Sequence, residues 1–133
     1  MGRPKNLKEV ILLRRNGIPA HVANGDFLDA FYAAPIADKQ LFLNTEPSNT
    51  EGMDITVSSL AQYASIAEKL AHDFDLEVPE WVNKDIYFLS SLHLAGKPAC
   101  EYPDELIECL LEETPIEFRR RNLIVSENIL ERR

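Results

Sequence analysis

The segment from Thr56 to Phe74 carries the clearest structural signal in the chain. Its apolar side chains recur at alternating spacings of three and four residues, the period of an α-helix. They are Val57, Leu60, Ala64, Ala67, Ala71 and Phe74, with a second stripe of Tyr63, Ile66 and Leu70 beside them. Two adjacent apolar stripes predict a helix buried along much of its surface. We therefore expect an all-α fold, a compact multi-helix domain around a central amphipathic helix at 56–74.

Helix signals flank this segment on both sides. Helices are predicted over 7–15, 26–34, 35–42, 103–114, 115–122 and 126–130, with a short helix that begins at Pro79 and carries Trp81. Asn6 is the expected N-cap of the first helix, and Gly17 its left-handed C-terminal residue. Thr114 and Glu117 have the spacing of a capping box. Residues 44–52 are predicted to form an exposed loop and 123–125 a buried connector, while 85–94 fit either a helix or a strand.

Length and composition fit one folded domain spanning residues 1–133. The chain is 45% apolar and 27% charged, an ordinary globular composition that excludes a disordered or collagen-like chain. No apolar run approaches the ~20 residues that span a bilayer, and Arg14 and Arg15 interrupt the only candidate signal-peptide core. A cytoplasmic protein without membrane contact is expected. Cys100 and Cys109 are then reduced thiols, with Cys109 predicted to be buried on the apolar side of its helix.

Charge is distributed unevenly along the chain. Residues 1–24 have five basic and one acidic side chain, a balance of +4, and residues 119–133 have five and two, a balance of +3. Residues 25–118 have 4 basic and 19 acidic side chains, so the middle of the chain has a balance of −15, and the whole chain has a net charge of −8. This pattern predicts a basic N-terminal arm or helix over 1–24, followed over 25–133 by an acidic helical body with a basic C-terminal end.

Motifs for catalysis, cofactors and metals are missing from the sequence, so no enzyme activity, cofactor or metal is predicted. Glu68 and His72 are four residues apart and could share a helix face, but a metal site would need a second such pair. Glu105, Glu108 and Glu112 resemble half of a di-iron site, although without a Glu-x-x-His they fit a solvated helix face better.

Two basic segments could contact a partner. Gly2-Arg3-Pro4-Lys5 shares three residues with minor-groove AT-hooks, and is otherwise expected to be a disordered terminus. The second segment is Arg119, Arg120, Arg121 and Asn122. Successive helical side chains diverge by about 100°, so three arginines cannot serve one ligand. In one alternative Arg119 or Arg121 pairs with acids of the body such as Glu112, Glu113 or Glu117. In the other, the outermost arginine binds an acidic groove or a phosphate of a partner.

Three blocks of the sequence resemble a widespread family of small bacterial proteins. Residues 113–126 read ETPIEFRRRNLIVS, which is similar to the family's terminal pattern Glu-Ser/Thr-Pro-x-x-Phe-Arg-Arg-Arg-Asn-x-Phe-Val-Ser; residues 26–35 (DFLDAFYAAP) and 78–81 (VPEW) resemble two further blocks. Ile124 stands where an aromatic residue is usual. Genes of this family are often labelled as transcriptional regulators or lie beside a nucleotidyltransferase-like toxin gene, so the resemblance implies an antitoxin or regulatory role.

These observations favour a non-enzymatic, antitoxin-like protein that binds and neutralises a partner protein, such as a basic toxin encoded nearby. Complementary charge between an acidic body and such a toxin would speed their association. One alternative is a DNA-binding autoregulator that uses Arg3, Lys5, Arg14 and Arg15, although only one helix fits before Pro19 and a helix-turn-helix is incomplete. Another is an enzyme without a recognisable motif, with a pocket near Glu68 and His72.

Overall fold

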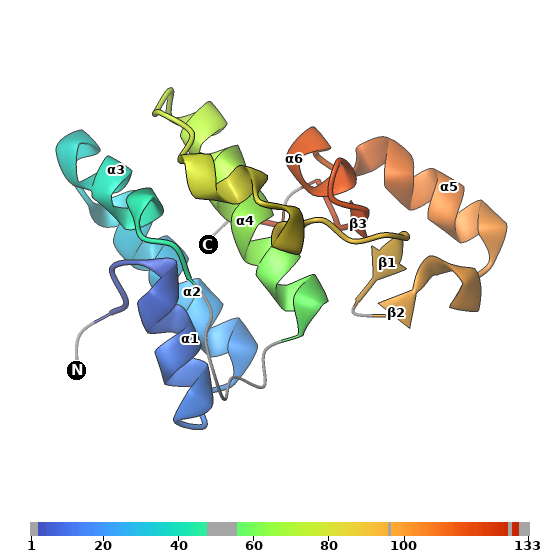
Figure 1. The fold of residues 1–133 in the computed structure, drawn as a ribbon, viewed down its shortest axis with the longest axis horizontal. Helices are drawn as coiled ribbons and strands as arrows, with labels where there is room; N and C mark the ends of the chain where they lie inside the picture. The colour runs from blue at the N-terminus through green and yellow to red at the C-terminus, as the bar shows by residue number, and fades with distance from the viewer. Residues whose placement is uncertain (1–2, 48–55, 96, 128, 131–133) are drawn as a thin grey trace.

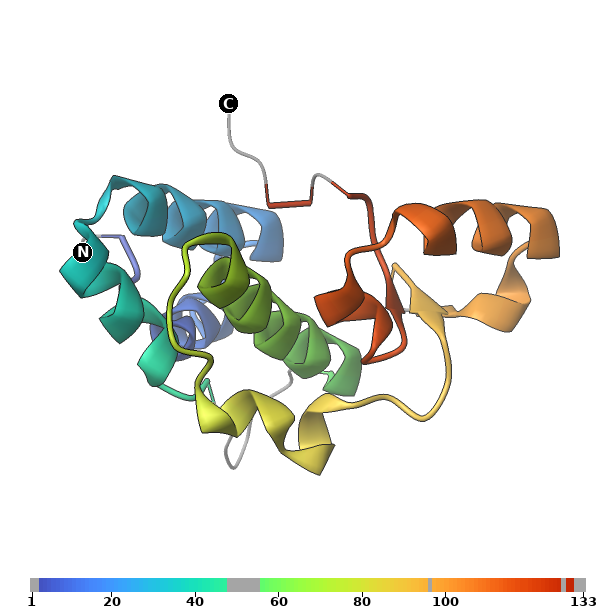
Figure 2. The same ribbon diagram turned by 90° about the horizontal axis from the view of Figure 1, so that it is seen from above.

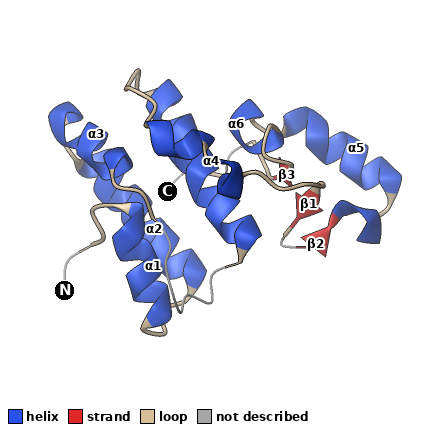
Figure 3. Cartoon of the chain, in the orientation of Figure 1, coloured by secondary structure: helices blue, strands red, loops and turns tan. Residues whose placement is uncertain are grey.

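The computed structural model describes residues 3–47, 56–95, 97–127, 129 and 130. Helices make up most of this part of the chain, and three very short strands form a small sheet (Figure 3). The fold is therefore mostly α, as predicted, but the expectation of a strictly all-α protein is wrong. In Figure 1 the helices α1 to α3 lie on one side of α4, and the strands with α5 and α6 lie on the other.

Helices α1 (Leu7–Arg15) and α2 (Ala20–Ala33) form an N-terminal pair. Asn6 caps α1 as predicted, since its Oδ1 accepts a hydrogen bond of 2.9 Å from the Glu9 amide, and Gly17 adopts a φ of 95° after its end. Pro4 is buried, so residues 3–24 form a packed helical segment rather than a free arm. Helix α2 begins at Ala20, six residues before the predicted start, because Pro19 occupies the N-cap position, where it needs no amide donor.

Aromatic side chains join α2 to α3 (Ile36–Asn44) in the core. The ring of Phe31 packs edge-on against those of Phe42 and Phe74, with centroids 5.9 and 5.2 Å away. Lys39 is only 5% exposed among these rings. Its Nζ donates to the carbonyl oxygens of Ala34 at 2.5 Å and Tyr32 at 3.3 Å, so a buried ammonium group caps the C-terminal end of α2.

Helix α4 (Val57–Asp73) begins after its N-cap Thr56, whose hydroxyl accepts from the Ser59 amide. Six residues of its two predicted apolar stripes, Tyr63, Ala64, Ile66, Ala67, Leu70 and Ala71, are each at most 4% exposed. Leu60 and Phe74, near the two ends of the stripe, are half-buried, and the Val57 side chain lies outside the described part of the chain. Alanines on α4 let neighbouring backbone approach closely. Seen from above, α4 lies between the N-terminal helices and α6 (Figure 2).

Two short 3₁₀ helices, η1 (Glu80–Asn83) and η2 (Asp85–Tyr87), pack against α4. As predicted, a short helix after Pro79 carries Trp81 into the core, where its Nε1 donates to the Leu43 carbonyl at 2.9 Å. The Trp81 and Tyr87 rings are edge-on with centroids 5.3 Å apart. The ambiguous segment 85–94 thus contains a 3₁₀ turn followed by a strand.

The sheet consists of β1 (His93–Leu94), β2 (Lys97–Pro98) and β3 (Leu123–Ile124), in the order β2-β1-β3. Strand β1 is antiparallel to β2 and parallel to β3, with His93 opposite Leu123 and Leu94 opposite Ile124. The predicted connector at 123–125 therefore contains a strand. Strands of two residues are too short to produce a periodic sequence pattern.

Helices η3 (Ala99–Glu101), α5 (Asp104–Glu113) and α6 (Ile116–Arg119) complete the fold. Thr114 does not form the predicted capping box, because its hydroxyl donates to the carbonyls of Leu110 and Val125 at 2.7 and 3.0 Å. Cys109 is exposed rather than buried, since α5 buries Ile107 against the rest of the chain and turns Cys109 outward.

Residues 126, 127, 129 and 130 are not helical, contrary to the predicted last helix. Within the described ranges, no helix has the length and apolar character to cross a membrane.

Candidate functional site

The predicted partner-binding residues 119–122 run from the last residue of α6 through the turn that follows it, and their side chains diverge in space. Arg119 and Arg120 are exposed, Arg121 is completely buried and Asn122 is half-buried. The structure therefore does not bring the three arginines together at the surface. Arg120 and Arg121 both bind the Glu68 carboxylate, and Asn122 binds the Leu89 carbonyl.

Arg121 joins three elements of the fold. Its Nη1 lies 2.6 Å from Glu68 Oε1 on α4 and donates to the Glu117 carbonyl at 2.8 Å, while Nη2 donates to the Val82 carbonyl on η1 at 2.8 Å. The guanidinium carbon is 4.8 Å from the centroid of the Phe88 ring. Burial lowers the pKa of Arg121 and the Glu68 carboxylate opposes that shift; arginine retains its charge at neutral pH. Arg121 cannot contact a partner in this conformation.

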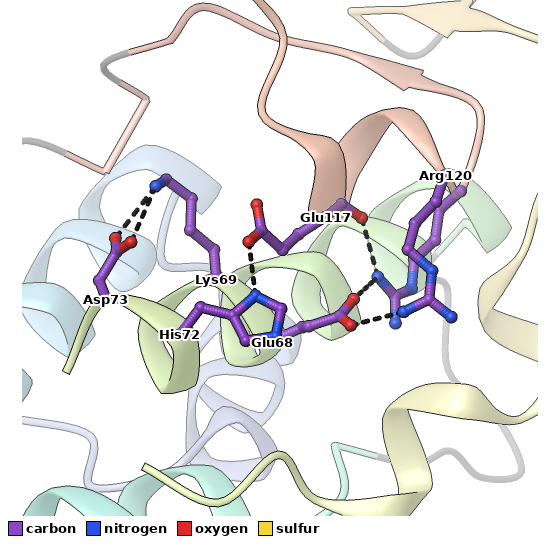
Figure 4. Close-up of polar contacts among 7 residues, drawn as sticks. Glu68, Lys69, His72, Asp73, Glu117 and Arg120 are labelled. Carbon is purple, nitrogen blue, oxygen red and sulfur yellow. Dashed lines mark hydrogen bonds and ion pairs between the residues drawn. The ribbon is translucent and has the colours of Figure 1, made fainter. Parts of the chain in front are cut away.

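Arg120 shares the same carboxylate. Its Nη1 lies 2.5 Å from Glu68 Oε2, and its Nη2 donates to Asn83 Oδ1 at 3.1 Å. The close-up in Figure 4 shows Glu68 on α4 directed toward the arginine side chains at the end of α6. One carboxylate thus accepts from two guanidinium groups, an arrangement that compensates the cost of burying its charge.

Asn122 is the last residue of the turn between α6 and β3. Its φ of 64° is left-handed, a conformation that asparagine tolerates better than most residues. The side-chain Nδ2 donates to the Leu89 carbonyl at 2.6 Å, and the Asn122 carbonyl accepts from the His93 amide at 2.9 Å. The block from Arg120 to Asn122 therefore fastens α6 and β3 to α4 and to the segment 82–93.

The predicted pair Glu68 and His72 does not converge on one site. Glu68 accepts from the two arginines, whereas His72 Nδ1 lies 2.6 Å from Glu117 Oε2 (Figure 4). Glu117 was a predicted partner of an arginine, but its carboxylate contacts His72 and only its carbonyl contacts Arg121. Among the residues with described positions, no three His, Cys, Asp or Glu side chains are grouped as a metal site would require.

Acidic side chains concentrate on α5, at one end of the molecule (Figure 1). Asp104, Glu105, Glu108, Glu112 and Glu113 are all exposed. The sequence has no basic residue between Lys97 and Arg119, and the ion pairs found between described residues include none of these five carboxylates. We call this set the α5 acidic surface. Glu105, Glu108 and Glu112 lie three and four residues apart and so share one face of the helix.

The basic residues proposed for DNA contact are divided between the two ends of α1. Arg3 and Lys5 precede the helix and are exposed, whereas Arg14 and Arg15 occupy its last turn. Lys5 and Arg15 are ten residues apart, roughly 15 Å along a helix. Arg14 is engaged internally, because its Nη1 donates to the Tyr63 hydroxyl at 2.9 Å, which in turn donates to Asn24 Oδ1 at 2.8 Å.

Buried tyrosines provide a titration that tests this packing. Burial raises the pKa of Tyr63 above its ordinary value of 10.0 despite the opposing charge of Arg14, and burial together with Glu46 raises that of Tyr87. The folded protein should therefore hold these protons at pH values where the unfolded chain releases them, so stability present below about pH 10 is lost as the pH rises further. Absorbance titration of the native protein should show some tyrosines that ionise only at a pH above the ordinary tyrosine pKa. The Y63F and Y87F variants should each have one fewer tyrosine of this kind. Native tyrosines that all ionise together with those of the urea-unfolded chain would contradict this prediction.

A hollow of about 690 Å³ lies beside the start of α4. Thr56, Ser58, Ser59 and Gln62 line one part of it, and His93 and the aliphatic side chains of β1 and β3 line another. His93 Nδ1 lies 2.8 Å from the Ser91 carbonyl, so Nδ1 carries the donated proton. Neither Glu68 nor His72 lines this hollow, so it does not form the pocket considered for an enzyme.

Comparisons of the chain with family models, with curated proteins and with solved structures find no match in any of the three.

Sequence reasoning missed two features of this region. The first is Glu68 as the partner of Arg120 and Arg121, more than fifty positions away along the chain. The available signal was the position of Glu68 beside the apolar stripe of a helix predicted to be buried, where a carboxylate needs a basic partner. The second is the position of α5 at the end of the molecule, where none of its carboxylates forms an ion pair with another described residue. The absence of lysine and arginine over 98–118 was the available signal.

Proposed function

We propose that the protein is a non-enzymatic, antitoxin-like binding protein whose acidic surface neutralises a basic partner protein. The α5 acidic surface is the observation that carries this proposal. It offers five exposed carboxylates on one short helix, and no ion pair between described residues uses them. The resemblance of residues 113–126 to a family with toxin-linked genes points in the same direction.

Electrostatics explains why such a helix suits a basic partner. Like charges three or four residues apart each destabilise a helix by about 0.2–0.5 kcal/mol, so Glu105, Glu108 and Glu112 repel one another in the free protein. Lysine or arginine side chains of a partner would relieve that repulsion and steer the encounter. Arg119 is exposed six residues after Glu113, and it stays a predicted contact for the partner protein. Arg120 and Arg121 instead bind Glu68 within the fold.

Charge reversal on α5 tests the proposal. We expect E105K/E108K/E112K to weaken binding to the product of the neighbouring gene by about 100-fold, because each reversal at an exposed, solvent-screened contact costs about 1 kcal/mol of binding free energy in total. Co-expression followed by size-exclusion chromatography, titration calorimetry and growth rescue are the measurements. The wild-type complex should also weaken as salt is raised.

A matched variant controls for net charge. Glu77, Glu80 and Asp85 are exposed on the segment around η1 and η2, so E77K/E80K/D85K changes the total charge by the same amount away from α5. It should retain binding and rescue. Failure of the wild-type protein to form a complex or to rescue growth would refute the antitoxin-like function, and equal losses in the two triple variants would refute the assignment to α5.

A further inference from the structure

A second hollow, of about 590 Å³, lies between the N-terminal segment and the corner where α2 meets α3. Its walls are mostly apolar and come from Ala30, Ala33, Ala34, Pro35, Leu41 and Phe42. Leu41 is 62% exposed, a large aliphatic side chain left in contact with water. A volume of this size accommodates a few side chains of a ligand rather than a whole structural element. We call this site the α2–α3 hollow.

Two cations stand at the α2–α3 hollow in a protein whose net charge is −8. Arg3 and Lys5 both line it and are exposed, and Asp38 is the one acid among its lining residues. In the described ranges of the chain, neither cation takes part in an ion pair. The hollow therefore combines an apolar floor with an excess of positive charge, which is the complement of an acidic amphipathic segment.

Helix α5 of the protein has this composition. Glu105, Cys109 and Glu113 follow one another at four-residue spacing, and Leu106 is three residues from Cys109, so all four share one side of the helix. Leu106 is 41% exposed, and the other three residues are also exposed. This side of α5 thus offers two adjacent apolar side chains between two carboxylates.

The hollow and α5 cannot meet within one molecule. Figures 1 and 2 both show α3 at one end of the long axis and α5 at the other. We propose that the α2–α3 hollow binds α5 of a second copy of the chain, with Leu106 and Cys109 over the apolar floor and Glu105 and Glu113 beside Arg3 and Lys5. The contact joins two different surfaces, so it is head-to-tail and leaves one free hollow and one free α5 in every dimer.

This association is independent of the proposed toxin partner but uses the same helix. A basic protein bound to α5 would compete with it, and α5 of one molecule would be covered when no partner is present. Because both protomers carry a net negative charge, overall repulsion opposes the local attraction. Association should therefore be weak.

Sedimentation equilibrium of the purified full chain tests the self-association. The weight-average mass should rise above 15.1 kDa with increasing protein concentration. R3E/K5E and E105K/E113K alone should each need about tenfold higher concentration to associate, since each places like charges across the contact. An equimolar mixture of these two variants should associate again, because one contributes an unchanged α5 and the other an unchanged hollow.

Two controls separate the proposed contact from general effects. K8E/R15E changes the net charge as R3E/K5E does, at exposed positions of α1 outside the hollow, and should associate like the wild type. L41E should prevent association, whereas I86E, at an exposed aliphatic side chain on η2 (55% against 62% for Leu41), should not. A wild-type protein that stays at its monomer mass up to about 1 mM would overturn the proposal, as would variants of the hollow that associate normally.

Discussion

Replacing Arg121 with alanine is expected to lower the free energy of unfolding by about 3–5 kcal/mol, the range for removing one partner of a buried ion pair. Arg121 is 0% exposed and joins α4, α6 and η1 through Glu68, Glu117 and Val82. Its loss leaves two carbonyl groups without their donor and opens a cavity where the guanidinium group lay. Urea unfolding followed by circular dichroism and by Trp81 fluorescence is the measurement.

Two further variants test whether the loss of stability comes from the buried ion pair. R119A should change stability by no more than about 0.5 kcal/mol, because Arg119 is exposed. E68Q/R121M removes both charges of the buried pair, and it should be more stable than the sum of the two single changes predicts, by about 1–3 kcal/mol. A cost below 1 kcal/mol for R121A would show that Arg121 does not hold these elements together.

Replacing Lys39 with alanine is expected to cost about 2–4 kcal/mol. Hydrogen bonds to charged groups contribute about 1.5–3 kcal/mol, and the Lys39 ammonium group donates to two carbonyls at the end of α2. Its Nζ also lies 5.3 Å from the ring centroids of Phe31 and Phe74. Urea unfolding measures the loss, and hydrogen exchange should show that the last turn of α2 opens more often.

Two controls isolate the contribution of the ammonium group. K39M keeps an apolar side chain of similar length, so it should lose only the share of the unfolding free energy that the hydrogen bonds contribute. It should therefore be more stable than K39A. K84A removes an exposed lysine paired with Glu46 and should cost at most about 1 kcal/mol. An equal effect of K39A and K84A would contradict a capping role for Lys39.

Much of the helical framework could be predicted because its signals are local. The apolar stripe of α4, the N-cap Asn6 and the left-handed Gly17 each depend on residues within one or two turns. The early start of α2 at Ala20 was missed because Gly25 and the polar residues around it weaken the apolar period. Cys109 was misplaced for a different reason: helix periodicity identifies an apolar side but cannot say whether a neighbouring element covers it.

The sequence by itself determined the positions of most helices, the concentration of negative charge in residues 25–118 and the lack of familiar catalytic motifs. These properties follow from residue type and short-range spacing. Only the tertiary structure decided that Glu68 meets Arg120 and Arg121, that β1 pairs with β3, and that α5 lies far from the cations near α3. The physical reason is that a buried charge selects its partner by geometry across the folded chain, and sequence separation carries no information about that geometry.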